Sequence, residues 1–241
     1  MSLPSLLQRN DIWRGDEASS ALDASPSVSS GFVELDALLP GSGFPIGTLI
    51  EIIVPRFGIG ELRLLLPAIT RLTRERWLAF VAPPHIPYAP ALARAGVDLS
   101  HVLVVNTNER SDTLWAAEQA LRAGTCGAVL AWPTKTDFKW LRRLQLAAEA
   151  GGTMGVVFSP MHHAATSSPA ALRLRLEPQS DGLAVHVLKR RGGWPAGPLL
   201  LDWSTLRQGR RLRREVPSYA VAMSWASQSP AGNLHAGGAH R

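Results

Sequence analysis

The stretch that decides the fold is TLIEIIVPRFGIGELRLLL, residues 48–66. Its first part, Thr48–Val54, is short, apolar and rich in β-branched residues, which predicts a buried strand. The loop Pro55–Gly60 follows, and a helical pattern begins at Glu61, with Pro67 expected to kink it. A buried strand, a glycine-containing loop and a helix form the first unit of a parallel sheet. In such sheets this loop is where backbone N–H groups and the helix dipole bind phosphate.

The loop lacks the residues that nucleotide chemistry requires. A working phosphate loop reads GxxxxGK[ST], in which the lysine neutralises phosphate charge and the hydroxyl residue binds Mg²⁺. Here Gly58 and Gly60 supply glycines, but Glu61 and Leu62 stand at the lysine and hydroxyl positions. A later apolar strand ends in Trp132-Pro133 rather than in the acid that such ATPases carry. We therefore interpret the loop as a structural strand-to-helix turn and expect neither ATP hydrolysis nor a cofactor.

The remaining chain predicts an α/β fold. Short apolar strands alternate with helices up to about residue 158, and shorter strands joined by turns such as Ser180-Asp181-Gly182 follow. This order indicates a mostly parallel sheet flanked by helices, with an antiparallel extension. We expect an N-terminal segment and linker at 1–30, a folded body at 31–214 and a flexible C-terminal tail at 215–241.

Composition excludes several classes of protein. Hydrophobic residues make up 46% of the 241 residues and charged residues 18%, which suits a sizeable core and is too apolar for global disorder. No apolar run approaches the length of a membrane helix, and a single cysteine cannot form an internal disulfide. The pair His162-His163 lacks the spacing of a metal site. We expect a cytoplasmic protein, associated with the nucleoid, without a metal ion.

Positive charge gathers near the C-terminal end of the expected body. One tryptophan, Trp194, lies within this cluster. The basic residues are Lys189, Arg190, Arg191, Arg207, Arg210, Arg211, Arg213 and Arg214. Such a cluster suits phosphate backbones or an acidic partner, and an indole among arginines can stack on single-stranded bases. A solvated face, with the tryptophan packed at a sheet edge, is the alternative. Further on, Tyr219, Met223 and Trp225 are candidate partner anchors within the polar tail.

Several segments resemble known families. Residues 30–52, which include SGFVELDALL, GSGFPIG and LIEI, resemble the start of a RecA core. Lys189 and Arg191 match the two RecA lysines that reach a neighbouring subunit's nucleotide. Residues 56–66, 114–130 and 142–155 resemble more specifically ImuA, the RecA-like accessory protein of damage-induced mutagenesis. The same middle section also resembles SulA, the SOS inhibitor of cell division that binds FtsZ.

The ImuA resemblance implies a RecA-like core that works as a non-enzymatic scaffold of translesion DNA synthesis. Its implied partners are an ImuB-like protein, an error-prone DnaE-type polymerase and RecA, with weak single-stranded DNA binding by the basic run. We favour this interpretation because the chain keeps both the RecA-like start and the basic C-terminal portion, which SulA lacks. The alternative is a SulA-type inhibitor that caps FtsZ. Glu61, Leu62 and Trp132 argue against an active ATPase.

Overall fold

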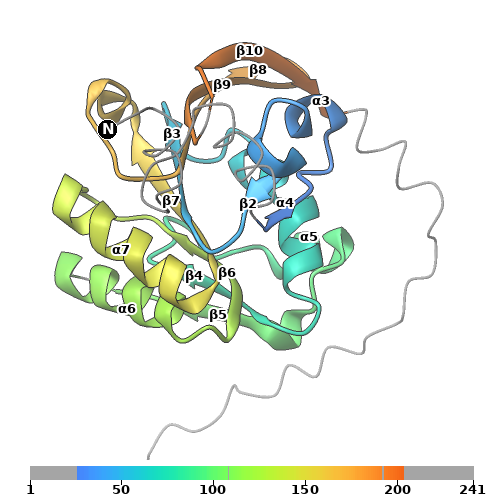
Figure 1. Cartoon of the computed structure of the whole chain (residues 1–241). Coiled ribbons are helices and arrows are strands. Elements are labelled where there is room, and N and C mark those ends of the chain that lie inside the picture. Colours follow the sequence, from blue (N-terminus) through green and yellow to red (C-terminus); the bar gives the residue numbers. More distant parts are fainter. Residues whose placement is uncertain (1–25, 108, 192, 204–241) are drawn as a thin grey trace, which may run out of the picture.

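The computed structural model describes residues 26–107, 109–191 and 193–203. Its central feature is an eight-stranded sheet with the strand order β10-β9-β8-β3-β7-β6-β4-β5 (Figure 1). The strands are β3 (Leu49–Val54), β4 (Trp77–Val81), β5 (Val102–Val105), β6 (Cys126–Ala131), β7 (Met154–Pro160), β8 (Leu172–Gln179), β9 (Gly182–Arg190) and β10 (Ala196–Asp202).

The sheet is parallel from β8 through β3, β7, β6 and β4 to β5, and antiparallel from β8 through β9 to β10. The change of direction follows the turn at Ser180-Asp181, which is short enough to join only antiparallel strands. The predicted α/β class, with a mostly parallel sheet and an antiparallel extension, is confirmed.

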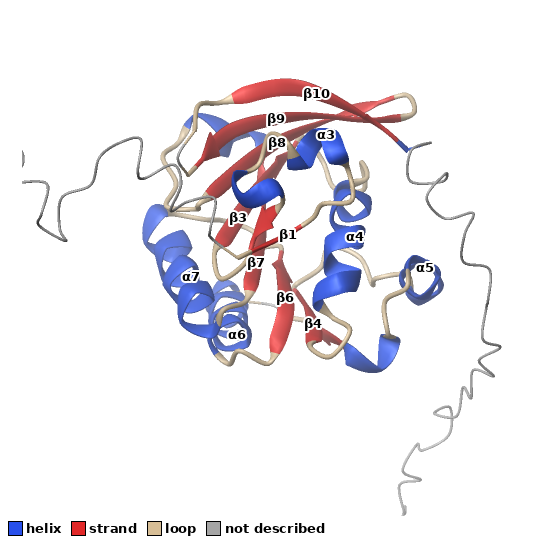
Figure 2. Cartoon of the chain, turned by 45° about the vertical axis from the view of Figure 1, so that its right-hand side comes forward, coloured by secondary structure: helices blue, strands red, loops and turns tan. Residues whose placement is uncertain are grey.

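Helices cover both faces of the parallel part. They are α3 (Val33–Asp36), α4 (Glu61–Leu72), α5 (Ala89–Ala95), α6 (Arg110–Arg122) and α7 (Phe138–Gly151), with 3-10 turns η1 (Pro40–Ser42), η2 (Leu99–His101) and η3 (Met161–Ala165). Figure 2 shows α6 and α7 on one side of the sheet and α4 and α5 on the other. None of the helices in the described ranges is long and apolar enough to cross a membrane.

The starts of α7 and α6 differ in how they are capped. The Asp137 carboxylate accepts the N–H of Trp140 at 2.7 Å and so caps α7. Helix α6 begins at Arg110, with Glu109 at the capping position and no side-chain capping bond. The helix α4 runs through Pro67 without ending there.

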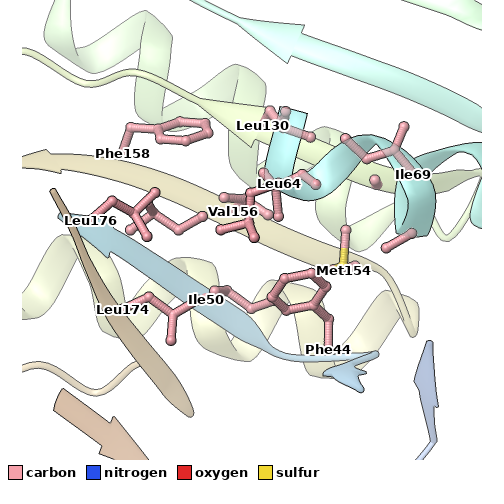
Figure 3. Packing of buried hydrophobic residues seen from close by; sticks show 14 of the residues in the cluster. Phe44, Ile50, Leu64, Ile69, Leu130, Met154, Val156, Phe158, Leu174 and Leu176 are labelled. Atoms are coloured by element: carbon pink, nitrogen blue, oxygen red, sulfur yellow. The ribbon is translucent and has the colours of Figure 1, made fainter. Parts of the chain in front are cut away.

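Alternate residues of β3 serve two separate hydrophobic cores. Ile50, Ile52 and Val54 pack in the core on the α4 side, whereas Leu49 packs in the core beneath α6 and α7. Figure 3 shows the α4-side core, in which Ile50 lies among side chains from α4 and neighbouring strands. Every residue of β3 is buried, and all of them are apolar except Glu51.

The ordered pairing begins within the segment assigned above to a linker. Strand β1 (Ser27–Val28) pairs antiparallel with β2 (Phe44–Pro45). Asp36 accepts hydrogen bonds from the Ser29 hydroxyl at 2.6 Å and from the Ser30 N–H at 2.8 Å. These contacts attach residues 27–30 to α3 and β2, which precede β3 in the chain.

Candidate functional site

The loop before α4 uses its backbone donors internally. The Gly58 N–H donates to Glu61 Oε1 at 2.8 Å, and the Gly60 N–H donates to Glu61 Oε2 at 3.1 Å. Glu61 is buried, and its carboxylate lies at the positively polarised end of α4. These are the donors that a phosphate would use in a loop of this kind. In this structure the chain's own carboxylate accepts both of these N–H groups.

A tryptophan covers the same loop from outside. Gly60 has φ of +111°, and a Cβ there would lie 2.7 Å from the Trp203 ring. The Arg63 guanidinium lies 4.6 Å from the centre of that ring, and Phe32 flanks it with a ring-to-ring distance of 6.3 Å. Residue 60 must therefore be glycine both for its backbone conformation and because the indole leaves no room.

The two positions that would hold a magnesium ion are apolar. Leu62 packs partly buried against the α4-side core. At the end of β6, Trp132 is buried and stacks on Phe158 at 4.5 Å and on Phe80 at 6.0 Å between ring centres. In the described ranges no group of three or more histidine, cysteine or acidic side chains could hold a metal ion.

The described part of the basic cluster is largely engaged with the fold. Lys189 Nζ donates to the Ser168 carbonyl at 2.8 Å, and burial together with neighbouring Arg173 lowers the Lys189 pKa. Arg190 donates to the carbonyls of Leu38 and Trp194. The Trp194 side chain itself is exposed. The other candidates, Arg207, Arg210, Arg211, Arg213, Arg214, Tyr219, Met223 and Trp225, lie outside the described residues.

A buried ion pair fastens the segment after β7. Arg173 Nε donates to Glu51 Oε2 at 2.8 Å, and both side chains are almost fully buried. The same guanidinium donates to the carbonyls of His163 at 2.7 Å and Thr166 at 2.9 Å. Burial, with the charge of His162 nearby, lowers the His163 pKa. The pair supports the carboxyl end of β7 and has the contacts of a structural element.

The edge formed by β5 differs from these regions, which lie largely buried within the fold. Within the described residues β5 pairs only with β4, so one side of its backbone faces outward (Figure 1). Six of the thirteen exposed large hydrophobic side chains in those residues come from positions 77–104, which build this edge. They are Trp77, Ile86, Tyr88, Leu99, Leu103 and Val104. We call these six residues the β5-edge patch.

The patch combines features of a protein-binding surface. Leu103 and Val104 lie on opposite faces of β5 and are 44% and 38% exposed, although adjacent positions in an internal strand would both be buried. Tyr88 is 70% exposed, and Trp77 packs edge-on against His101 at 5.5 Å. Exposed apolar groups that cluster at an unpaired strand mark sites of association.

Comparison with known proteins gives one consistent answer. The family model for the cell division inhibitor SulA matches residues 55–155. SulA of Edwardsiella piscicida is 36% identical over 142 residues, which span 55% of this chain and 79% of that protein. The chain belongs to the SulA family. SulA of Klebsiella aerogenes is 31% identical over 51% of this chain and 69% of its own length.

One solved structure matches part of the chain. The crystal structure of SulA from Pseudomonas aeruginosa matches 46% of this chain and 97% of its own, with 24% identity and a TM-score of 0.39. The residues matched by the SulA family model include the loop before α4 and all of the β5-edge patch. Lys189, Arg190, Arg191 and Trp194 lie beyond it.

These comparisons overturn the preferred functional interpretation of the sequence. The prediction of a translesion-synthesis scaffold was wrong, because the similar proteins are cell division inhibitors. The predicted partners, an ImuB-like protein, a DnaE-type polymerase and RecA, were wrong for the same reason. The RecA-like start and the basic strand end misled the interpretation. Lys189 and Arg190 instead hold backbone carbonyls of the chain's own loops.

Sequence reasoning missed the β5-edge patch altogether. Val102–Val105 reads as one more short apolar strand, and nothing in its pattern shows that it ends the sheet. The available signal was indirect: Ile86, Tyr88 and Leu99 are apolar residues placed between the predicted elements.

Proposed function

We propose that this protein inhibits cell division during the SOS response by binding FtsZ, and that the β5-edge patch makes the contact. Family membership supports the inhibitory role. The observation that carries the site is the concentration of exposed apolar side chains along β5 and the segments beside it. An inhibitor of assembly needs an accessible surface of this kind rather than a pocket for a substrate.

The patch suits a protein partner in two ways. Trp and Tyr side chains are the common anchors of interfaces, because each buries a large area with few rotatable bonds to fix. Trp77 and Tyr88 supply such anchors. The outward backbone of β5 adds N–H and C=O groups that can pair with an extended segment of a partner. In this proposal, FtsZ bound at this edge is prevented from assembling further.

We also infer that the parallel sheet is a RecA-like core whose nucleotide site has become a structural element. Two observations support this: the Glu61 carboxylate accepts the loop N–H groups, and the Trp203 ring covers Gly60. The inferred core does not hydrolyse ATP. Its task is to hold the β5-edge patch in a fixed shape. Of the expected limits 31–214, we retain residue 214 as a proposal, and we move the start of this core to include β1 at Ser27.

The direct test is an FtsZ polymerisation assay. Increasing amounts of the purified full chain are added to FtsZ with GTP, and sedimented polymer is measured. We expect loss of polymer at about one inhibitor per FtsZ. The inhibition should be the same whether or not ATP is present. Unchanged polymer at a tenfold excess of a folded, monodisperse protein would contradict the proposed function.

A second measurement separates the function from its site. The Tyr88→Ala variant should retain its unfolding temperature, since the side chain is exposed, but should lose at least 1 kcal/mol of FtsZ-binding free energy if Tyr88 is an anchor. If the unmodified chain inhibits FtsZ and Tyr88→Ala inhibits equally well, the function stands and Tyr88 is removed from the interface.

A further inference from the structure

A pocket lies at the amino end of the sheet, away from the β5 edge. Its volume is about 360 Å³. Its walls come from segments far apart in sequence: Pro26, Pro40 and Pro45 before β3, and Leu172 at the start of β8. Three proline rings and a leucine form an apolar hollow that can enclose one large side chain.

Two opposite charges and one buried hydroxyl accompany the apolar walls. Arg191 and Glu149 line the pocket, and their charged groups are 4.0 Å apart. Both side chains remain about half exposed, so each can pair with a charge on an occupant. Thr48 also lines the pocket, and its buried hydroxyl has no hydrogen-bond partner in the described residues. The preferred occupant is therefore an apolar group flanked by an acid and a base.

We propose that the N-terminal segment of this chain occupies the pocket, with Trp13 inserted between the prolines. The sequence around it is Asp11-Ile12-Trp13-Arg14, in which two large apolar residues stand between an acid and a base. Asp11 pairs with Arg191 and Arg14 pairs with Glu149. The indole has the size and the apolar faces that the proline walls accommodate.

The connection to the pocket makes this occupant favourable. Pro26, the first described residue, is itself part of the wall, and residues 14–25 join it to Trp13. Those residues reach at most about 40 Å when fully extended. Attachment so close to the pocket gives the segment an effective concentration on the order of millimolar. A contact of only millimolar intrinsic affinity is then occupied about half of the time.

The test places a photo-cross-linker at position 13 of the full chain. Trp13→p-benzoylphenylalanine is irradiated, and cross-linked peptides are identified by mass spectrometry. We expect intramolecular cross-links to the pocket walls, at Pro40, Pro45 or Leu172. The matched control carries the same group at Ser20, which is nearer to the pocket along the chain but lies in a polar stretch. Tethering alone would give the control at least as many cross-links, whereas we expect at least threefold fewer.

A charge exchange distinguishes recognition from proximity. Arg191→Asp should lower the pocket cross-link yield at least threefold, and adding Asp11→Arg should restore most of it. Arg191 is half exposed, so a thermal melt should show that both variants remain folded. Equal yields from positions 13 and 20 would overturn the proposal, as would a yield that ignores the charge at 191. Cross-links that join differently isotope-labelled copies would also overturn it, because they would assign the pocket to a second molecule.

Discussion

A sheet of this type can bind a ligand or partner at the loop between β3 and α4 or at the edge strand β5. The groups available for binding are already engaged within the chain in the loop, whereas they are exposed at the edge. In the loop, two backbone N–H groups are bonded to Glu61 and the glycine at 60 is covered by Trp203. At the edge, Leu103, Val104 and Tyr88 expose apolar surface next to an unpaired backbone.

The difference indicates which of the two regions remains available to a partner. Satisfied donors and a filled surface stabilise the fold and have little left to offer a partner. Unpaired strand groups and exposed apolar side chains cost solubility unless a partner uses them. We therefore expect substitutions in the loop to change the free energy of unfolding, and substitutions at the edge to change inhibition.

The largest expected effect on stability is at Gly60. Gly60→Ala forces a residue with a Cβ into φ of +111° and against the Trp203 ring, which should cost about 3 kcal/mol from backbone strain and overpacking together. Urea unfolding followed by circular dichroism measures this loss. In a Trp203→Ala background the same change should cost only about 1 kcal/mol, because the steric conflict is gone. An equal cost in both backgrounds would mean that the indole does not press on residue 60.

A smaller effect is expected at Glu61. Glu61→Gln removes the charge that accepts the Gly58 and Gly60 N–H groups at the start of α4, and should cost about 1–2 kcal/mol of unfolding free energy. Glu34→Gln, at an exposed position on α3, is the control and should stay within about 0.5 kcal/mol. Folded Glu61→Gln protein should inhibit FtsZ as well as the unmodified chain does. A loss of inhibition without a loss of stability would mean that the loop is part of the FtsZ-binding surface.

The smallest expected effect on stability comes from His163, which lies outside both regions. Burial lowers the His163 pKa, so the unfolded chain binds a proton at a higher pH than the folded chain does. Stability should therefore fall as pH drops through and below about 6.5, the ordinary histidine pKa. His163→Gln should flatten this part of a pH series of urea midpoints. A steeper decline in the variant would contradict the assignment to His163.

Much of the fold follows from the sequence because its signals are local. The apolar stretch Thr48–Val54, the start of α4 at Glu61 and the turn at Ser180-Asp181 are each indicated by a few neighbouring residues. The presence of Glu61 and Leu62 where a working phosphate loop has a lysine and a hydroxyl residue is equally local. The strand order is different, because it depends on contacts between distant segments, and only the order shows that β5 is an edge.

The basic run and Trp132 misled the sequence analysis because most of their contacts are with residues distant in the chain. A basic run such as Lys189-Arg190-Arg191 indicates a charged surface, but Lys189 and Arg190 donate to the carbonyls of Ser168, Leu38 and Trp194. Two of these partners, Ser168 and Leu38, are distant in the chain. Likewise Trp132 marks a missing acid in the sequence, and only the structure shows that it fills the space by stacking on Phe158 and Phe80.

The most direct test compares two leucines of matched exposure. Leu103 on β5 is 44% exposed, and Leu146 on α7 is 45% exposed, with α7 covering the sheet away from β5. Leu103→Lys and Leu146→Lys should have similar unfolding midpoints, so differences in FtsZ inhibition report the surface alone. We expect Leu103→Lys to raise the half-inhibitory concentration at least tenfold and Leu146→Lys to change it less than twofold. Equal inhibition by the two variants, or a larger loss from Leu146→Lys, would contradict the assignment of FtsZ binding to the β5 edge.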